Sequence, residues 1–370
     1  MRGESEKQRS LLVYLNVDER IPGDHPLRKI KAQADAGLAA LSPRFEAAYT
    51  DFGRPSIPPE QLLKALLLQA LYSIRSERQL VEQLNWNVLY RWFVDLAADA
   101  PIWNATTFTK NRDRFAEHGL IQAFFDGVVK QAMAQGLVSK DHFSVDATLI
   151  QSLASLKSLE RRDGNPPKRD DDDPGNPSVN FRGEKRVNDT HVSKTDPDAK
   201  LMRKGDGRET KLYHGASALM ENRHGLCVAL AVHAPFPTAE REAVPVMVRH
   251  VRKGLGLRVK TTGADAGYAD GKSLTAWEQM GITPYVAKVK PPKDFSVPGA
   301  DARARAVRRE RTRGYSISQR IRKRIEEIFG WAKTTGGLAR TRFRGRWRLA
   351  LQVLVVGAAY NLVRMAKMAG

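Results

Sequence analysis

The sequence is poor in cysteine and in uninterrupted apolar stretches. Cys227 is the only cysteine among 370 residues, which excludes an intrachain disulfide and a cysteine-based zinc cluster. No apolar signal core follows the first methionine. The longest apolar run, 349–363, is interrupted by Gln352, Gly357 and Asn361, so a buried core helix explains it better than a membrane span. These absences predict a soluble cytoplasmic protein with no membrane partner.

Acidic residues are also scarce relative to basic ones. The chain has 61 Lys and Arg against 41 Asp and Glu, a net charge of +20. Such an excess indicates a polyanionic partner, because cationic side chains release counterions from a phosphate backbone. The hydrophobic fraction of 42% is otherwise typical of a globular protein, and the length suits two or three domains. Without a membrane signal, nucleic acid is the favoured polyanion.

Residues 1–140 are predicted to be helical. Ser56–Pro59 is a helix start that is followed by leucines at helical spacing, and Ser76 opens a second helix with a capping box. An aromatic-rich helix is expected over 87–96 and a fourth helix from Thr106. The fourth helix exposes the basic residues Lys110, Arg112 and Arg114. This pattern fits a helix-turn-helix-like DNA reader, and equally a helical bundle whose last helix has a solvated face.

Residues 141–370 show an α/β pattern. The sequence predicts strands over 142–150, 211–220, 226–233, 257–263 and 282–289, and helices over 238–253, 272–280 and Ser318–Trp331. A hairpin followed by alternating helices and strands indicates a mixed sheet flanked by helices. Two segments are expected to be irregular. One is an inserted, partly disordered loop over about 157–207 that includes the run Asp170–Asp173, and the other is 291–313.

Two aspartates stand in unusual settings. Asp146 lies within a predicted strand between apolar neighbours, where an acid is disfavoured and is costly if buried unpaired. It must therefore cap an edge, pair with an arginine or hold a cation. Asp265 follows a predicted strand end inside the segment Gly263–Tyr268, whose small residues leave room for a ligand. A simple turn aspartate is the alternative for Asp265.

A glutamate on the last predicted amphipathic helix is the third candidate. Arg322, Glu326 and Lys333 recur at helical spacing on one stripe. A surface pair between Arg322 and Glu326 is the simpler alternative, worth only about 0.3–0.5 kcal/mol. However, residues 301–350 contain sixteen Arg or Lys and four Asp or Glu. A glutamate among so many phosphate-binding groups is suited to hold a metal beside a phosphate. Glu327 lies on a different helix face and is the less favoured ligand.

Three carboxylates of this kind suit a two-metal phosphoryl-transfer site. Mg²⁺ prefers oxygen ligands, and a pair of ions activates the attacking oxygen and stabilises the leaving one. Asp146 would bridge both ions, while Asp265 and Glu326 would each hold one. Arg322 and Lys333 would contact phosphates and offset the charge of the transition state.

These residues resemble a known family. The blocks Phe143–Asp146, Gly263–Tyr268 and Arg322–Lys333 are similar to the DDE transposases of bacterial insertion sequences, in the fourth and fifth large families. Gln319 stands where that family usually has a tyrosine, so the family's tyrosine role is not expected here, whereas the triad is unaffected by this departure. Further similar segments are Arg54–Pro59, Ser73–Leu80, Asn188–His191, Thr195–Asp198 and Ala359–Arg364.

The resemblance implies an RNase H-like catalytic core over 141–370 and a helical DNA-binding and dimerisation domain over 1–140. The implied activity is endonucleolytic hydrolysis at transposon ends, followed by transfer of the 3′-hydroxyl into target DNA. Two Mg²⁺ ions, replaceable by Mn²⁺, would serve Asp146, Asp265 and Glu326. The implied partners are terminal inverted repeats, target DNA and a second copy of the chain, near the bacterial nucleoid. Implied DNA contacts are Arg322, Lys333, Tyr268, Lys110, Arg112, Arg114, Arg340, Arg342 and Arg344.

Three other functions compete with this interpretation. A tyrosine recombinase is excluded, because its His-x-x-Arg motif occurs only at His25–Arg28, far from any late tyrosine. A catalytically silent, domesticated transposase would bind DNA as a regulator without cutting it. An RNase H-like nuclease would cleave without strand transfer.

Overall fold

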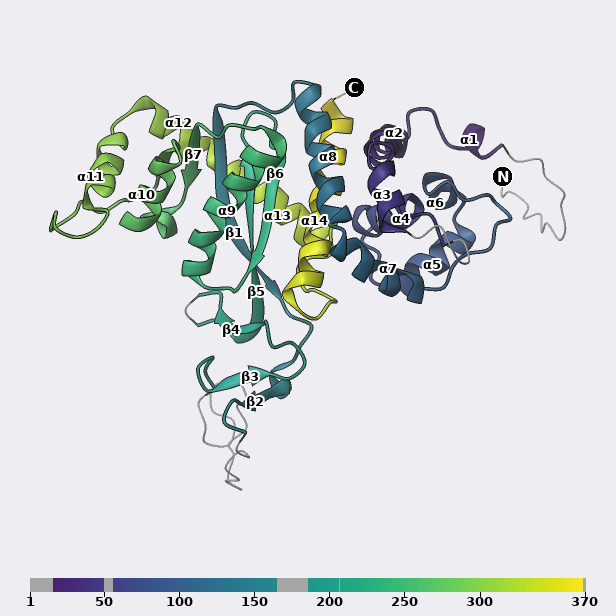
Figure 1. Cartoon of the computed structure of the whole chain (residues 1–370), viewed down its shortest axis with the longest axis horizontal. Helices are drawn as coiled ribbons and strands as arrows, with labels where there is room; N and C mark the ends of the chain where they lie inside the picture. The colour runs from purple at the N-terminus through teal and green to yellow at the C-terminus, as the bar shows by residue number, and fades with distance from the viewer. Residues whose placement is uncertain (1–15, 50–55, 165–185, 206, 369–370) are drawn as a thin grey trace, which may run out of the picture.

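A six-stranded sheet lies at the centre of the computed structural model, which describes residues 16–49, 56–164, 186–205 and 207–368 (Figure 1). Its strands are β1 (His142–Gln151), β4 (Lys200–Arg203), β5 (Thr210–Glu221), β6 (Cys227–His233), β7 (Thr261–Ala264) and β8 (Thr283–Val286). The predicted strands and the hairpin at 221–225 are confirmed to within a few residues.

The strand order identifies the fold. The sheet runs β6-β5-β1-β7-β8, and β4 pairs with the first part of β5. Only β5 runs antiparallel to its neighbours, because β1, β7 and β8 are mutually parallel. In an RNase H-like core, three consecutive antiparallel strands are followed by two parallel strands, which lie on the far side of the first strand. The sheet of this protein has that arrangement. The predicted fold class is confirmed.

Helices cover the sheet and complete its core. They are α9 (Pro237–Leu255), α10 (Gly271–Gln279), α11 (Ala300–Arg309), α12 (Arg313–Ile321), α13 (Ile325–Thr334) and α14 (Arg346–Met368). Helix α9 packs on β5 and β6, α12 on β7 and β8, α13 on β1, and α14 on β6. By length and composition α14 could cross a membrane, but 78% of its apolar window is buried inside the protein. It is the buried core helix that the sequence predicts.

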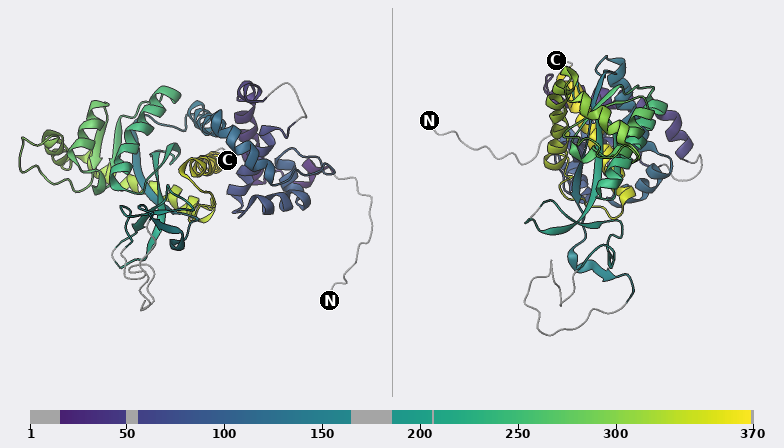
Figure 2. Two further views of the ribbon diagram at one scale, coloured as in Figure 1. Left: turned by 60° about the horizontal axis from the view of Figure 1, so that its bottom comes forward. Right: turned by 90° about the vertical axis from the view of Figure 1, so that its left-hand side faces the viewer.

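The N-terminal part is a helical lobe. Its helices are α1 (Val17–Arg20), α2 (Pro26–Ala39), α3 (Ser42–Ala48), α4 (Pro59–Leu71), α5 (Glu77–Trp86), α6 (Val88–Phe93), α7 (Thr106–Glu117) and α8 (Leu120–Ala134). The predicted start at Ser76 is confirmed, since its hydroxyl accepts a hydrogen bond from the Gln79 amide. Helix α8, the last of the lobe, and α14 lie between helices α1–α7 and the sheet, while α10 and α11 lie at the opposite end (Figures 1 and 2). One continuous apolar core joins lobe and sheet.

Three local predictions are wrong. The segment 157–207 contains β2 (Leu159–Arg161), β3 (His191–Ser193) and β4, because pairing with partner strands stabilises segments whose composition is loop-like. Its acidic run Asp170–Asp173 lies outside the described residues. The segment 291–313 contains α11, an Ala- and Arg-rich stretch with good helix propensity. The single helix predicted over Ser318–Trp331 is instead α12 and α13, separated by the 3₁₀ turn η3 (Arg322–Arg324).

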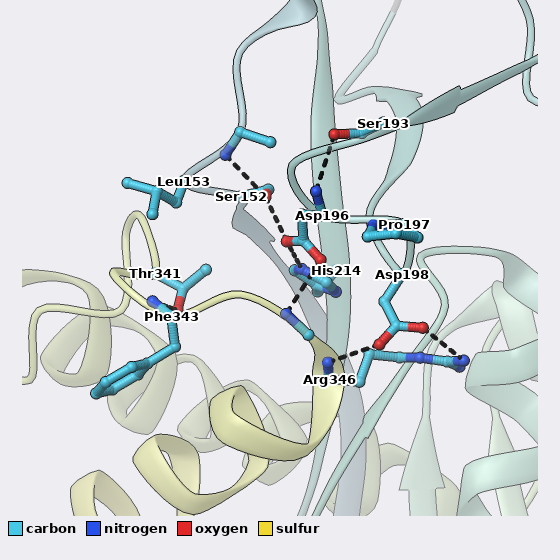
Figure 3. A network of polar contacts seen from close by, with 12 residues as sticks. Ser152, Leu153, Ser193, Asp196, Pro197, Asp198, His214, Thr341, Phe343 and Arg346 are labelled. Carbon is cyan, nitrogen blue, oxygen red and sulfur yellow. Dashed lines mark hydrogen bonds and ion pairs between the residues drawn. The ribbon is translucent and has the colours of Figure 1, made fainter. Parts of the chain in front are cut away.

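A buried polar network attaches the insertion to the core (Figure 3). The Asp196 and His214 side chains are fully buried. Asp196 Oδ2 accepts a hydrogen bond from Ser152 Oγ at 2.6 Å and lies 2.8 Å from His214 Nε2. Asp196 Oδ1 accepts from the Gly345 amide at 3.1 Å. Ser152 and His214 share one carboxylate oxygen, so the set is a structural clamp between β1, β5 and the start of α14 rather than a hydrolytic relay.

Candidate active site

Strand register places Asp146 and Asp265 next to each other. Ser144 of β1 pairs with Gly263 of β7, and both strands run in the same direction. Asp146 lies two residues further along β1, and Asp265 lies two residues after Gly263, just beyond the end of β7. The charge of Asp265 acts on Asp146, so the two carboxylates are neighbours. Residues two apart in a strand share a face. The two aspartates therefore share the sheet face that Gly263 presents to α12 and η3.

Helix α13 covers the same face. Thr148 and Ile150 lie on the same face of β1 as Asp146. They line a small cavity together with Phe329 and Lys333 of α13. Asp146 thus points toward the helix that carries the predicted third acid.

The charge of Asp146 is poorly compensated. The pKa of Asp146 is raised to about 6, chiefly by burial and also by the nearby carboxylates of Asp265 and Glu240, while the Ala147 amide and Arg322 oppose the rise. Its one hydrogen bond within the described chain comes from the Ala147 amide, at 2.8 Å. No lysine or arginine of the described residues forms an ion pair with it. A buried acid in this state is stabilised by a cation.

Asp265 is held by its own turn. Its Oδ1 accepts a hydrogen bond from the Gly267 amide at 2.8 Å, which caps the 3₁₀ turn η2 (Ala266–Tyr268). This is the turn role that the sequence left open. The second oxygen of the carboxylate stays available to a ligand, so the two roles coexist.

Gly263 allows the covering helices to approach the sheet. A Cβ atom at this position would lie 2.7 Å from Ser318 Oγ and 3.2 Å from Arg322 Cβ. Only glycine fits such an approach without a shift of α12 and η3. That approach is what brings Arg322 close enough for its charge to act on Asp146.

Gly263→Ala is expected to lower the free energy of unfolding by about 1–3 kcal/mol, since the added methyl group overpacks the site. It should also reduce catalytic activity, because Arg322 must move away. Gly330→Ala in α13 is the matched control: nothing lies within 4 Å of its added Cβ, and it should be neutral or stabilising by about 0.5–1 kcal/mol. Urea unfolding midpoints measure both effects. Equal midpoints for the two variants would contradict the close approach.

Glu326 lies in the first turn of α13 and is exposed. It makes no hydrogen bond or ion pair with any described residue, so the surface pair with Arg322 is not formed. Arg322 Nε instead donates to Gln319 Oε1 at 2.8 Å, and Gln319 Nε2 donates to the Tyr285 carbonyl at 2.8 Å. The residue that replaces the family's tyrosine therefore anchors Arg322.

Glu327 is occupied elsewhere. Its carboxylate pairs with Arg364 Nη1 of α14 at 2.6 Å. This contact directs it toward α14, whereas Glu326 stays unpaired between Arg322 and Lys333, whose charges both act on Asp146.

The structure brings two of the three predicted acids together and places the third on the helix above them. In the described part of the chain, no three His, Cys, Asp or Glu side chains lie close enough to hold one metal ion. The donor set nevertheless fits a hard divalent cation, because it consists of carboxylate oxygens without a basic partner.

Glu240, in the first turn of α9, was not predicted from the sequence. Its pKa is raised by burial and by the charge of Asp265. An acid in the first turn of a helix is commonplace, so the sequence alone offers no signal that distinguishes it.

The predicted DNA contacts divide into buried and exposed groups. Tyr268 is 0% exposed and packs on Trp277, with ring centroids 5.7 Å apart, which contradicts its predicted contact with DNA. Lys333 is half-buried beside Asp146, and burial lowers its pKa. Lys110 and Arg344 are exposed, and neither makes a hydrogen bond or ion pair within the described residues.

The other predicted arginines have partners within the chain, although Arg340 is exposed. Arg112 pairs with Glu77 and stacks 4.4 Å from the Phe343 ring. Arg114 stacks 4.2 Å from the Tyr49 ring. In the segment before α14, arginines donate to backbone carbonyls: Arg340 to Leu153 at 2.9 Å and Arg342 to Ile74 at 2.8 Å. These four side chains connect elements of the fold, so their predicted contacts with DNA would compete with internal partners.

Comparison with protein families gives two matches along the chain. Residues 15–114 match a transposase domain model, and residues 182–362 match a transposase DDE domain model. The second range includes Asp265 and Glu326, whereas Asp146 lies between the two ranges. No curated protein matches the chain.

Among solved structures, a piggyBac transposase synaptic complex with hairpin DNA is similar at 8% identity and a TM-score of 0.37, covering 93% of this chain and 76% of that one. A Mos1 transposase paired-end complex with the left transposon end is similar at 8% identity and a TM-score of 0.21, covering 78% and 86%. The strand order of the sheet identifies the RNase H-like fold independently of these two structures.

Proposed function

The chain belongs to the DDE transposases, and from this membership we propose that it cuts DNA at transposon ends and joins the freed 3′-hydroxyl to target DNA. One observation carries the proposal: Asp146 of β1 and Asp265, which follows the end of the adjacent parallel strand β7, lie close enough for their charges to interact, and neither forms an ion pair with a described lysine or arginine. A strongly basic helical segment lies above them. A pair of half-buried acids under phosphate-binding groups is suited to metal-assisted phosphoryl transfer.

Enzymes of this class depend on a divalent metal, and we propose two Mg²⁺ ions, which Mn²⁺ can replace. Asp146, Asp265 and Glu326 are the residues that would hold them. When bound, the ions supply Lewis-acid activation of the attacking oxygen and stabilisation of the leaving oxygen. Glu326 must approach the aspartates for this, and the exposed, unpaired state of its side chain leaves it free to do so.

The basic side chains of the site would position the DNA. Arg322, anchored by Gln319, would contact the scissile phosphate from one side, and Lys333 from the other. Because Lys333 and Arg322 are both close enough to Asp146 for their charges to act on it, a phosphate held by them lies above the aspartates. Their positive charge offsets the negative charge that develops as the phosphoryl group is transferred.

The proposed partners are double-stranded end DNA, target DNA and a second copy of the chain in the DNA complex. The helical lobe, 1–140, would bind the end sequence and the remainder, 141–370, would carry the chemistry, in the bacterial cytoplasm near the nucleoid.

A test uses labelled oligonucleotides that carry the inverted repeats flanking the reading frame. We expect strand cutting with Mg²⁺ or Mn²⁺, none with EDTA, and joining of the 3′-end to a target plasmid. Cutting without joining would indicate an RNase H-like nuclease. Tight binding without any cutting would indicate the regulator, an alternative that the match to a DDE domain does not favour.

Lys110→Ala is expected to weaken binding to end DNA severalfold and to reduce the slope of log affinity against log salt by about 1, because one phosphate contact is lost. Arg112→Ala should instead lower stability, since it leaves Glu77 without its partner. Titration of a fluorescent end oligonucleotide at several salt concentrations separates the two effects. An unchanged salt slope for Lys110→Ala would remove α7 as a DNA-contacting helix.

A further inference from the structure

A cavity of about 480 Å³ lies between the N-termini of α10 and α11, apart from the aspartates of the active site. Its walls come from three segments, which are the turn into α10, the loop that follows β8 and the first turn of α11. Because β7 and β8 are parallel, the segments that follow them leave the sheet at the same end, where Asp265 also lies. Ligands of α/β sheets bind at that end.

Positive side chains line this cavity without internal partners. Lys272, Lys290 and Lys293 are exposed, and none of their ammonium groups forms a hydrogen bond or ion pair with a described residue. Arg303 Nη2 donates to the Lys290 carbonyl at 2.8 Å, but the buried Nε of Arg303 has no hydrogen-bond partner in the described chain. A buried N–H group without a partner is disfavoured, and an anionic ligand in the cavity would supply the acceptor.

The two acids of the lining already have partners of their own. Asp270 Oδ1 accepts a hydrogen bond from the Ser273 amide at 3.0 Å, and Asp270 Oδ2 lies 3.4 Å from Arg241 Nε. The Asp294 carboxylate accepts hydrogen bonds from the amide and the hydroxyl of Ser296, at 2.8 Å each. The lysines therefore carry the uncompensated charge of the cavity, which favours an anion.

Two helix N-termini add to this preference for an anion. Gly271 and Gly299 pack against each other, since a Cβ atom on Gly271 would lie 2.8 Å from the Gly299 carbonyl oxygen. This contact brings the first turns of α10 and α11 together. Gly299 is the N-cap of α11 and has no side chain that could occupy the first-turn amides, which stay available to an anion. The loop between the two helices is restricted by Pro291, Pro292 and Pro298.

The chemistry of the lining fits a sugar-phosphate backbone. Among the described residues, no Asn, Gln or aromatic side chain borders the cavity, so it offers neither a stacking surface for a base nor an amide that pairs with base edges. Lysines and helix N-termini contact phosphates and hold DNA without reading its sequence. Binding of this kind suits the DNA outside a transposon, because its sequence differs at every insertion site.

The location of the cavity supports the same partner. Helices α10 and α11 pack on β8, at the end of the molecule opposite the helical lobe, and β1 and β7 lie between the two ends (Figure 1). In the proposed function the lobe binds the end sequence and the cut is made at the aspartates. DNA that continues past the cut then leads away from the lobe, toward α10 and α11.

We propose that the cavity lined by Lys272, Lys290, Lys293 and Arg303 binds the phosphate backbone of DNA beyond the transposon end. This DNA is the donor flank before the cut and the target afterwards. The inference rests on the proposed function, because it assumes that the lobe binds the end sequence and that the cut is made at Asp146 and Asp265.

The experiment titrates the full chain, in EDTA, with two fluorescent oligonucleotides that carry the same transposon end. One continues into flanking DNA, and the other stops at the cut. The double variant Lys272→Ala with Lys293→Ala should bind the flanked oligonucleotide severalfold more weakly, with the slope of log affinity against log salt reduced by about 2. Its affinity for the oligonucleotide that stops at the cut should equal that of the wild type.

The matched control is Lys130→Ala with Lys367→Ala, which removes two exposed lysines of α8 and α14 and therefore the same net charge. It should leave both affinities unchanged. A second measurement follows the joining of the pre-cut end to a target plasmid at subsaturating plasmid concentration, where only the Lys272 and Lys293 variant should be severalfold slower. Weaker binding of the flank alone, or slower joining alone, supports the inference and shows which DNA occupies the cavity. Loss of neither, or equal loss of affinity for both oligonucleotides, overturns it.

The proposed function fails separately from this inference, because the titration in EDTA needs no catalysis. If the wild type cuts and joins DNA while the Lys272 and Lys293 variant keeps wild-type binding and joining, the inference falls and the transposase proposal stands. If the wild type never cuts, yet these lysines strengthen its binding to the flanked oligonucleotide, the transposase proposal falls and the cavity remains a DNA-binding surface.

Discussion

Asp146→Asn is expected to abolish metal-dependent cutting of end DNA, with a loss of at least about 10³-fold in rate. Asp265→Asn and Glu326→Gln should cause losses of the same order. The physical reason is that an amide oxygen is a weaker ligand than a carboxylate and brings no negative charge to the cations. Binding of end DNA should change little, because the basic surfaces are untouched. Cutting is measured on labelled oligonucleotides at saturating DNA, and binding by fluorescence titration.

Glu327→Gln is the matched control for Glu326→Gln. The two acids are adjacent in α13, but Glu327 pairs with Arg364 whereas Glu326 is unpaired. Glu327→Gln should therefore keep nearly full cutting activity and lose at most a little stability. If Glu327→Gln stops cutting while Glu326→Gln does not, the third carboxylate has been assigned to the wrong glutamate.

Asp146→Asn should also stabilise the metal-free protein at neutral pH. Asp146 has a pKa of about 6 in the folded chain, against an ordinary value of 3.8. Between these values the unfolded chain loses the proton that the folded chain keeps, so stability falls as pH rises from about 4 to about 6 and stays low above. Removing the charge should restore on the order of 2 kcal/mol at pH 7.5 in EDTA. Thermal or urea unfolding across this pH range measures the effect.

Bound metal should make the wild type more stable than Asp146→Asn. With Mn²⁺ at pH 7.5, the wild type gains stability by ligand binding and Asp146→Asn gains little. Wild-type affinity for Mn²⁺ should rise with pH through about 6, since the ion displaces the proton. Asp141→Asn is the control, because the exposed Asp141 pairs with Lys260 and has a lowered pKa. A wild-type stability that is flat between pH 4 and 7 in EDTA would show that Asp146 is not perturbed.

The positive charge of the chain has two uses that composition cannot separate. In the segment before α14, Arg340 and Arg342 donate to carbonyls of distant segments, while Arg344 is exposed and unengaged within the described residues. Lys110 and Arg112, two residues apart in α7, differ in the same way. Exposed and engaged cations contribute equally to the net charge of +20. The charge therefore predicts the class of partner but not which residues contact it.

Features that depend on neighbours along the chain were predictable. The Ser76 cap, the helix starts at Pro59 and Thr106 and the alternation in β1 depend on local hydrogen bonds and side-chain periodicity. The order of strands and helices predicted the fold class, and three short motifs predicted the family. Even so, one long helix was expected where α12 and α13 are separated by η3, because the packing of η3 over Gly263 is not encoded locally.

Only the tertiary structure decided which residues that are far apart in the chain lie close together in the fold. The sequence determined that Asp146 is an acid in a strand and that Asp265 follows another strand. The parallel pairing of β1 with β7 brought the two aspartates close enough for their charges to interact. The packing of α9 on β5 and β6 brought Glu240 close enough for its charge to act on Asp146, and packing on Trp277 withdrew Tyr268 from the surface. These outcomes depend on strand register and helix packing between residues far apart in the chain, where burial and charge are set jointly by all the elements that meet.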